Sequence, residues 1–373
     1  MMNEENMSRD ARLARASARR LADETTPLIH NCWYVVAFSH DVQGSGMLAR
    51  KLLGRRVVLF RDEQGAIHAL RDRCAHRSFP LSQSTREGDE MVCAYHGFRY
   101  DAQGRCTHIP SQPEKLPGGI SVQHYPVIEQ SPHVWIWMGD PALAEQTPIP
   151  DVPWMRHSPQ WAAGHGYMRA DANYVHLHEN LLDLSHLTFL HAHTFGTPDY
   201  AKAPFDIEVG PARFIVRRTV SPTRLPPLYA EPTGMVGVDA ARIVQSMWLS
   251  PGLQTTGVVL QDLSEPPERR REWHLRTAQI ITPESQDSLH YHFTVVRDFA
   301  LQDERTTQFV LDGIRAAFIE DVAALEAIAA TKRGEQDPDF FESSAACDRA
   351  GVAMRRHLKD LAMAERTDAV EAA

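Results

Sequence analysis

The chain has 373 residues, of which 43% are hydrophobic, 23% charged and 8% aromatic. Single hydrophobic cores stop growing at roughly 250–300 residues, so this length and composition indicate a globular protein with two domains. The net charge of −9 and the dispersed basic residues argue against a nucleic-acid partner. No apolar run reaches the length of about 18 residues that a membrane-spanning helix needs, which excludes that class as well.

The chain contains five cysteines, an odd and sparse set that does not indicate a disulfide scaffold. The N-terminal segment carries several arginines but lacks the apolar stretch of a secretory signal, so we expect a cytoplasmic protein. In that compartment clustered cysteines favour a metal site.

Residues 1–27 are rich in small and polar side chains and predict an N-terminal extension that is frayed or weakly helical. A dense series of short strand signals then predicts a small all-β domain over 28–146. Tight turns are expected at 62–65 and 101–104. The strands are expected at 33–37, 57–60, 67–70, 98–100, 105–107 and 134–137.

The second domain is expected over 147–365, with a proline-rich linker at its start and a tail over 366–373. Its patterns mix helix and strand, and their order predicts an α+β domain in which helices pack on an antiparallel sheet. We expect helices at about 174–190 and 306–331 and strands around 211–220, 242–249 and 273–297.

The first candidate site is a doubled pair of cysteines and histidines in the all-β domain. Cys74 and His76 are followed, after sixteen residues, by Cys93 and His96. Two thiolates and two imidazoles at paired spacing suit either a structural zinc or an iron–sulfur cluster. A [2Fe–2S] cluster held by two cysteines on one iron and two histidines on the other is the Rieske arrangement.

The second candidate site is a polar row on the otherwise apolar segment 174–190. Buried ionisable groups persist when they are paired or bound to metal. On a straight helix His186 and His191 would diverge by about 140°, so the helix must end or distort near Leu190, with His193 as the alternative ligand. The row comprises His176, Glu179, Asn180, Asp183, His186 and His191.

The long helix at 306–331 carries one carboxylate, Asp321, inside its apolar stripe. Glu320 and Glu326 lie off the stripe and are expected to face solvent. Two histidines and one carboxylate form the facial triad of non-haem Fe(II) oxygenases. We therefore predict His186, His191 and Asp321 as iron ligands. The stripe contains Leu311, Ile314, Phe318, Leu325 and Ile328.

Both sites resemble those of one family. The run from Cys74 to Phe98 resembles the Rieske motif of Rieske non-haem iron oxygenases. The spacing of Glu179, Asp183, His186 and His191 resembles the mononuclear-iron motif of that family. The run 180–186 is similar to the vanillate and dicamba demethylase branch, and the resemblance covers about 28–365.

The resemblance implies a helix-grip-like catalytic domain, one [2Fe–2S] cluster and one mononuclear Fe(II) per chain. Cys74 and Cys93 would then hold one cluster iron, and His76 and His96 the other. It also implies a head-to-tail homotrimer in which electrons cross between subunits. Asp183 would bridge His96 of one subunit to the iron ligand of the next, and Asn180 would sit close to the iron.

The segment 44–49 fits a dinucleotide-binding pattern, but no helix can follow it before the next strand, so we expect no nicotinamide or flavin site. Electrons would then come from NAD(P)H only through a separate flavin and iron–sulfur reductase or a ferredoxin. The expected activity uses O2 to O-demethylate a methoxylated aromatic acid to a phenol and formaldehyde. The alternatives are a ring dioxygenase of the phenoxybenzoate type and, outside catalysis, an iron–sulfur electron carrier.

Overall fold

The computed structural model describes residues 19–44, 46–114, 118–335, 340 and 342–371. It divides into two units. The smaller unit comprises His30–Asp151 and Thr282–Ser285. The larger unit joins the segment before His30 to Val152–Ile281 and the residues from Gln286 onward. None of the described helices combines the length and the apolar character that crossing a membrane requires.

The smaller unit is built from short antiparallel strands, as predicted for an all-β domain, with three sheets among the residues described. The predicted turns are present, and Gly65 and Gly104 adopt positive φ values of 90° and 78° there. One sheet has the order β1 (Trp33–Phe38), β11 (His133–Trp137), β10 (Val127–Gln130). The second has the order β2 (Met47–Leu52), β3 (Arg55–Arg61), β4 (Ile67–Arg71), β9 (His124–Tyr125). The third has the order β5 (Thr85–Glu87), β6 (Glu90–Val92), β7 (Arg99–Tyr100), β8 (Cys106–His108).

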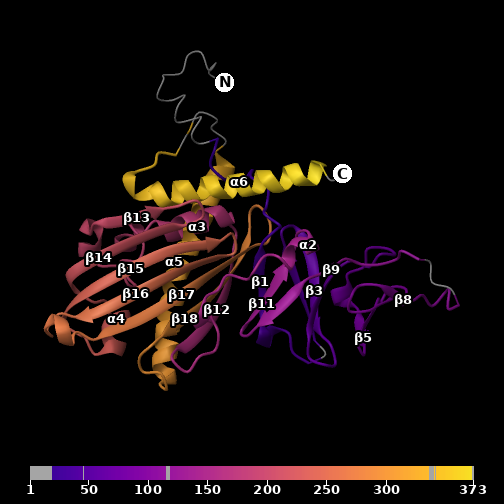
Figure 1. Ribbon diagram of the computed structural model, residues 1–373, viewed down its shortest axis with the longest axis horizontal. Coiled ribbons are helices and arrows are strands. Elements are labelled where there is room, and N and C mark those ends of the chain that lie inside the picture. The colour runs from indigo at the N-terminus through magenta and orange to yellow at the C-terminus, as the bar shows by residue number, and fades with distance from the viewer. Residues whose placement is uncertain (1–18, 45, 115–117, 336–339, 341, 372–373) are drawn as a thin grey trace, which may run out of the picture. The chain divides into compact units, whose positions relative to one another are not determined.

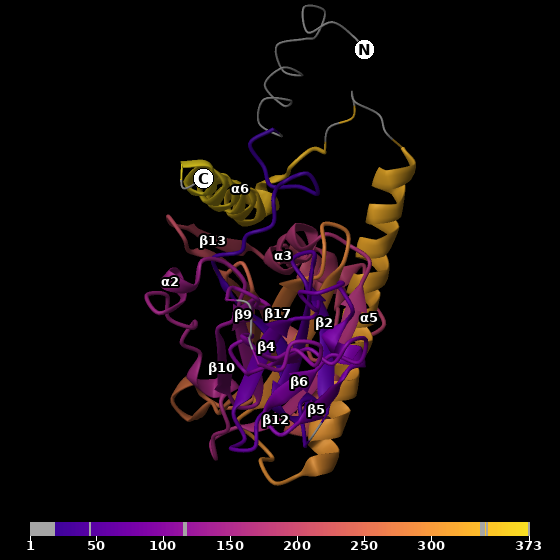
Figure 2. The same ribbon diagram turned by 90° about the vertical axis from the view of Figure 1, so that its right-hand side faces the viewer.

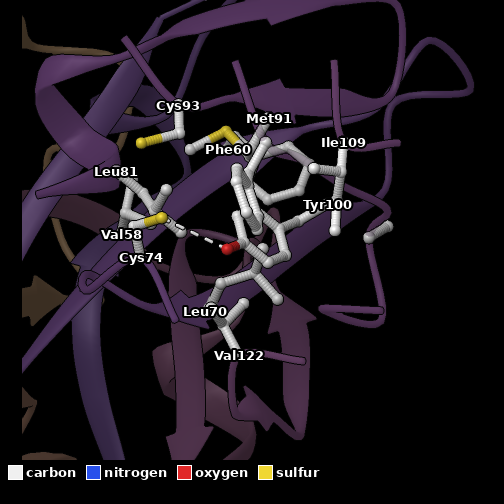
Figure 3. Close-up of a cluster of buried hydrophobic side chains, with 12 residues drawn as sticks. Val58, Phe60, Leu70, Cys74, Leu81, Met91, Cys93, Tyr100, Ile109 and Val122 are labelled. Atoms are coloured by element: carbon white, nitrogen blue, oxygen red, sulfur yellow. Dashed lines mark hydrogen bonds between the residues drawn. The ribbon is translucent and has the colours of Figure 1, made fainter. Parts of the chain in front are cut away.

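Short helices complete this unit: η2 (Ser39–Asp41), η3 (Leu81–Gln83) and α2 (Pro141–Ala144). Strand β2 begins at Met47, inside the segment that fits a dinucleotide pattern, so the described residues form a strand where such a site needs a helix. Figure 3 shows a cluster of buried aliphatic and aromatic side chains in this unit, with the thiols of Cys74 and Cys93 on one side of it.

The larger unit is built on one antiparallel sheet, which has seven strands in the described part of the chain (Figure 1). The predicted α+β class is confirmed. Strands β14 to β18 follow one another across the sheet, and β12 closes it beside β18. The order is β12 (Ala162–Ala170), β18 (Leu289–Arg297), β17 (Glu272–Pro283), β16 (Leu253–Asp262), β15 (Asp239–Ser250), β14 (Phe214–Arg224), β13 (Phe205–Val209).

Three helices pack on this sheet and on one another. Helix α3 (Tyr174–Leu182) contacts β14, β15 and α5 (Glu304–Gly334), and α5 runs along β12. Figure 2 shows α5 extending along the sheet, and Figure 1 shows α6 (Arg349–Glu371) lying near β13 and α3. The remaining helices are α4 (Pro227–Thr233), η4 (Pro153–Met155), η5 (His186–Thr188), η6 (Pro198–Lys202), η7 (Pro267–Arg269) and η8 (Ala346–Asp348).

The described residues nearest the two termini differ from the prediction. Residues 1–18 and 372–373 lie outside the described residues, but Ala22 is fully buried and exchanges two hydrogen bonds with Arg355 of α6. The described part of the predicted extension therefore packs on α6 instead of fraying. Helix α6 also continues through most of the predicted tail.

The helix predicted at 174–190 is too long. Asn173 caps its start by accepting a hydrogen bond from the amide of Val175 (2.9 Å), but α3 ends at Leu182. Asp183 adopts extended backbone angles (φ −109°, ψ 99°), which a continuing helix cannot accommodate. The helix predicted at 306–331 is confirmed by α5, although Ile328 of its predicted stripe is exposed.

Candidate metal centres

Two loops of the smaller unit carry the first site, and both fold in the same way. In each loop the cysteine amide donates to the carbonyl five residues later (2.8 Å), and the cysteine carbonyl accepts from the amide four residues later. The residue at that fourth position has a positive φ in both loops. The repeated geometry places the two cysteines in equivalent backbone positions, while His76 follows its cysteine by two residues and His96 by three. The bonded pairs are Cys74–Phe79, Ser78–Cys74, Cys93–Phe98 and Gly97–Cys93.

The thiols and imidazoles occupy different surroundings. Cys74 and Cys93 are buried, whereas His76 and His96 are exposed and their ring centroids lie 4.5 Å apart. The hydroxyl of Tyr100 lies 3.2 Å from the sulfur of Cys74 (Figure 3). Burial raises the pKa of the Cys93 thiol, so the thiolate that binds metal needs a cation beside it.

These four side chains fit two metal ions better than one. The ligands of a tetrahedral zinc lie about 2.0–2.3 Å from the ion, and therefore less than about 4 Å from one another. Among the described residues, the groups whose ligand atoms all lie within 4.8 Å of one another do not include this set. A binuclear cluster held by one pair of residues on each iron has no such requirement.

The second site lies in the larger unit, where three predicted ligands converge. The Nε2 atoms of His186 and His191 lie 3.5 and 3.3 Å from the same carboxylate oxygen of Asp321. The three ligand atoms lie within 4.8 Å of one another. Asp321 and His191 are buried, and His193, the alternative ligand, is exposed and outside the group. One carboxylate and two imidazoles in this geometry could hold a non-haem iron.

The early end of α3 explains how two histidines five residues apart reach one point. After Leu182 the amide of Ser185 donates to Oδ1 of Asp183 (2.7 Å), which turns the chain into η5. The backbone carbonyl of Asp183 accepts from Nδ1 of His186, which leaves Nε2 facing Asp321. The predicted distortion near Leu190 therefore occurs earlier, because α3 has already ended before the chain reaches either histidine.

Glu320 contacts a candidate metal ligand, which the sequence interpretation missed. Its Oε2 atom lies 2.8 Å from Nδ1 of His191 and accepts a hydrogen bond from Oγ1 of Thr194 (2.9 Å). The prediction that Glu320 faces solvent is thus wrong, because its side chain reaches around α5 to a loop that a helical wheel does not include. Glu326 is also bonded, since it accepts from the amide of Asp171 (2.9 Å).

Burial and charge set opposite proton affinities for the two histidines. Burial lowers the pKa of His186, which favours the neutral imidazole that binds metal. Burial alone would also lower the pKa of His191, but hydrogen bonds and charge from Asp321 and Glu320 raise it. A metal ion at Asp321 would replace the proton that His191 otherwise attracts.

Of the other residues in the predicted polar row, one contacts Asp321 and two connect helices. Nδ2 of Asn180 donates to Oδ1 of Asp321 (3.2 Å), so Asn180 contacts the ligand carboxylate. Both carboxylate oxygens of Glu179 lie 3.0 Å from Nη1 of Arg355, and His176 lies 3.3 Å from Nζ of Lys332. These two residues connect α3 to α6 and α5 and do not join the metal-binding group.

Family models match both units. The Rieske [2Fe-2S] domain matches residues 32–126, and the vanillate O-demethylase oxygenase C-terminal domain matches residues 170–364. An iron–sulfur subunit of the toluene-4-sulfonate monooxygenase system from Comamonas testosteroni is 37% identical over 80% of this chain and 87% of its own length. The oxygenase component of dicamba O-demethylase from Stenotrophomonas maltophilia is 28% identical over 90% of this chain and 98% of its own length.

Solved structures agree with this assignment. Dicamba monooxygenase bound to 3,6-dichlorosalicylic acid matches with a TM-score of 0.85 and 27% identity over 91% of this chain and 99% of that chain. Another structure of dicamba monooxygenase, with non-haem iron and dicamba, matches with a TM-score of 0.77 and 26% identity. The chain belongs to the Rieske non-haem iron oxygenases and is an oxygenase component of the vanillate O-demethylase type.

Proposed function

We propose that this chain is the terminal oxygenase of a multicomponent system that O-demethylates a methoxylated aromatic acid. The single observation that carries this proposal is the convergence of His186, His191 and Asp321 on one point of the larger unit. Relatives named vanillate and dicamba O-demethylases support the substrate class. The names of these relatives favour monooxygenation over ring dioxygenation and over an electron carrier.

In this proposal His186, His191 and Asp321 bind the mononuclear iron, while Cys74 and Cys93 bind one cluster iron and His76 and His96 the other. When bound, the cluster supplies electrons singly and the mononuclear iron activates O2. Asn180 positions Asp321 through its hydrogen bond, and Glu320 fixes the ring of His191 in the same way.

The electrons come from NAD(P)H through a separate flavin and iron–sulfur reductase or a ferredoxin. We propose a homotrimer in which Asp183 bridges His96 of one subunit to His186 of the next. The hydrogen bond from Nδ1 of His186 to the backbone carbonyl of Asp183 supports this role. A histidine that bound to Asp183 would be connected through this residue to His186, which is the proposed iron ligand. The balanced reaction converts a methyl ether, O2, two electrons and two protons to a phenol, formaldehyde and water.

A second candidate reaction is the monooxygenation of an aromatic sulfonate. The relative named for toluene-4-sulfonate is more similar to this chain, at 37% identity, than the two named demethylases, at 28% and 29%. Both reactions use the same centres and differ in the group that is oxidised.

The test is turnover of the reconstituted protein with a surrogate reductase and NADH on 4-methoxybenzoate, vanillate and toluene-4-sulfonate. We expect one formaldehyde per O2 consumed with a methoxylated acid, and none from the Asp321→Ala variant. A hydroxylated sulfonate without formaldehyde would favour the second candidate. A ring diol, or O2 uptake that Asp321→Ala retains, would overturn both.

A further inference from the structure

Two arginines lie buried side by side on the sheet of the larger unit. Arg218 and Arg242 are only 3% and 1% exposed. Arg242 of β15 pairs in register with Val220 of β14, and Val220 lies two residues beyond Arg218. Alternate residues of a strand face the same side, so both guanidinium groups lie on one face of the sheet.

No carboxylate contacts these charges. Within the described residues neither arginine has a carboxylate oxygen within 4.0 Å. Their hydrogen bonds go to the backbone carbonyls of 184, 195, 201 and 203, and Arg242 also interacts with the hydroxyl of Tyr229. Tyrosine rings lie against them instead. Cζ of Arg242 lies 4.7 Å from the ring centroid of Tyr229 and 5.2 Å from that of Tyr200, and Cζ of Arg218 lies 4.9 Å from Tyr200.

The tyrosines do not neutralise the arginines. Burial raises the pKa of Tyr200 to about 12 and also raises the pKa of Tyr229, so both phenols stay protonated at neutral pH. Leaving buried cations without a counter-ion is costly for a folded protein. An anion that enters this position would remove much of that cost.

The donors left without a protein partner match such an anion. Nε and Nη2 of Arg242, Nε of Arg218 and the hydroxyl of Tyr200 are buried and have no hydrogen-bond partner in the described chain. Nε and Nη2 form the edge of a guanidinium that binds oxyanions, and Arg56 uses these atoms to hold Asp72 (3.1 and 2.9 Å). The third nitrogen, Nη1 of Arg242, is already fixed by the carbonyl of Phe195 (2.7 Å).

The position is one aromatic ring away from the candidate iron site. The ring centroid of Phe195 lies 4.6 Å from that of His191, and Cζ of Arg242 lies 5.7 Å from the Phe195 ring. An aromatic substrate whose charged group reaches Arg242 could therefore direct its opposite end toward His191. The three tyrosine and phenylalanine rings also offer an apolar wall for the substrate ring.

We propose that Arg242 is the substrate-anion receptor of this oxygenase, and that Tyr200 and Arg218 assist it with their free donors. The ligand is the oxyanion group, carboxylate or sulfonate, of an aromatic substrate. This inference rests on the proposed function, since it names the residues that recognise the acid.

The test measures binding without turnover, on the oxidised holoprotein, by calorimetry. The probes are 4-methoxybenzoate and toluene-4-sulfonate, each compared with its neutral amide. Arg242→Gln should weaken binding of the preferred anion by roughly 10–100-fold and leave binding of its amide unchanged. Arg217→Gln is the matched control, because Arg217 is a partly exposed arginine next to Arg218 on β14 and pairs with Asp206 (2.7 Å). The probe that binds more weakly to Arg242→Gln shows whether the site recognises a carboxylate or a sulfonate.

Equal loss for anion and amide, unchanged binding of both, or no binding of any probe to the unaltered protein would overturn the proposal. If Arg242→Gln does not fold, Arg242→Lys keeps the charge but loses the two-nitrogen edge, and should still bind the anion more weakly than the unaltered protein does. The unaltered protein must itself prefer each recognised anion to its amide. Because these readouts need no reaction, Arg242-dependent binding without formaldehyde release would refute demethylation while leaving the anion site intact.

Discussion

The clearest single perturbation of the mononuclear site is Glu320→Gln. The carboxylate of Glu320 accepts from Nδ1 of His191 at 2.8 Å and from the hydroxyl of Thr194 at 2.9 Å. It fixes the orientation of the imidazole and holds its proton on Nδ1, which leaves Nε2 free as a ligand. Glutamine keeps the size of the side chain but removes the negative charge.

The expected loss follows from the role of such outer partners. Removing a carboxylate that orients a ligating histidine weakens metal affinity by about 10–100-fold, or roughly 1.4–2.7 kcal/mol. The lower part of this range is expected here, because the amide oxygen of glutamine can still accept from Nδ1 of the buried His191 and only the negative charge is lost. The cluster in the smaller unit should be unaffected.

The assay is competition for Fe(II) with a chelator, together with the EPR signal of the reduced cluster as an internal reference. Glu326→Gln is the matched control, since Glu326 lies on the same helix and bonds to the amide of Asp171. The reasoning is refuted if Glu320→Gln binds iron as the unaltered protein does, or if Glu326→Gln weakens binding equally.

Three further changes have distinct expected outcomes. Asp183→Asn keeps the backbone carbonyl that holds His186, so both metals should remain bound while product from pre-reduced protein in a single turnover falls sharply. Gly196→Ala places a Cβ 2.0 Å from the carbonyl oxygen of Leu187, so it should displace the loop after η5 and release the mononuclear iron while the cluster EPR signal persists. Burial, helped by Lys332, lowers the pKa of His176 from 6.5 to about 4. Between pH 6.5 and about 4 the unfolded chain therefore binds more protons than the folded protein. The free energy of unfolding should decrease by up to about 3 kcal/mol as the pH falls through this range, which urea titrations at several pH values would measure.

Each change has a control of the same residue type. Asp348→Asn alters a carboxylate close to Asp183 and should leave single-turnover product unchanged; equal loss would remove Asp183 from the electron route. Gly210→Ala meets only ordinary contacts, and iron loss there as well would contradict the steric argument. His176→Gln should flatten the pH dependence whereas His193→Gln should not, and a slope that survives His176→Gln would disprove its origin.

Local patterns made much of the architecture predictable. The turns at Gly65 and Gly104 and the long helix α5 follow from glycine placement and apolar periodicity, which depend on near neighbours in the chain. The convergence of His186, His191 and Asp321 could be predicted because buried ionisable side chains need a partner, and Asp321 stood out for that reason.

The errors arise where tertiary contacts override local pattern. The polar periodicity of the sequence continues past Leu182, but the turn from Asp183 to Ser185 ends α3 there. A helical wheel assumes a continuous helix and cannot show such a turn. The carboxylate of Glu320 acts on a loop 129 residues away in sequence. Arg242 carries no local motif at all, because its significance depends on rings and carbonyls brought together by the sheet.

The central claim is that the chain holds two independent metal centres, one in each unit. The most direct measurement is iron and acid-labile sulfide per chain, with the EPR spectrum of the reduced protein, for the unaltered protein and Asp321→Ala. The variant should lose about one third of its iron and keep its sulfide and its cluster signal. Retention of all the iron, loss of sulfide in parallel, or zinc in place of iron would contradict the account.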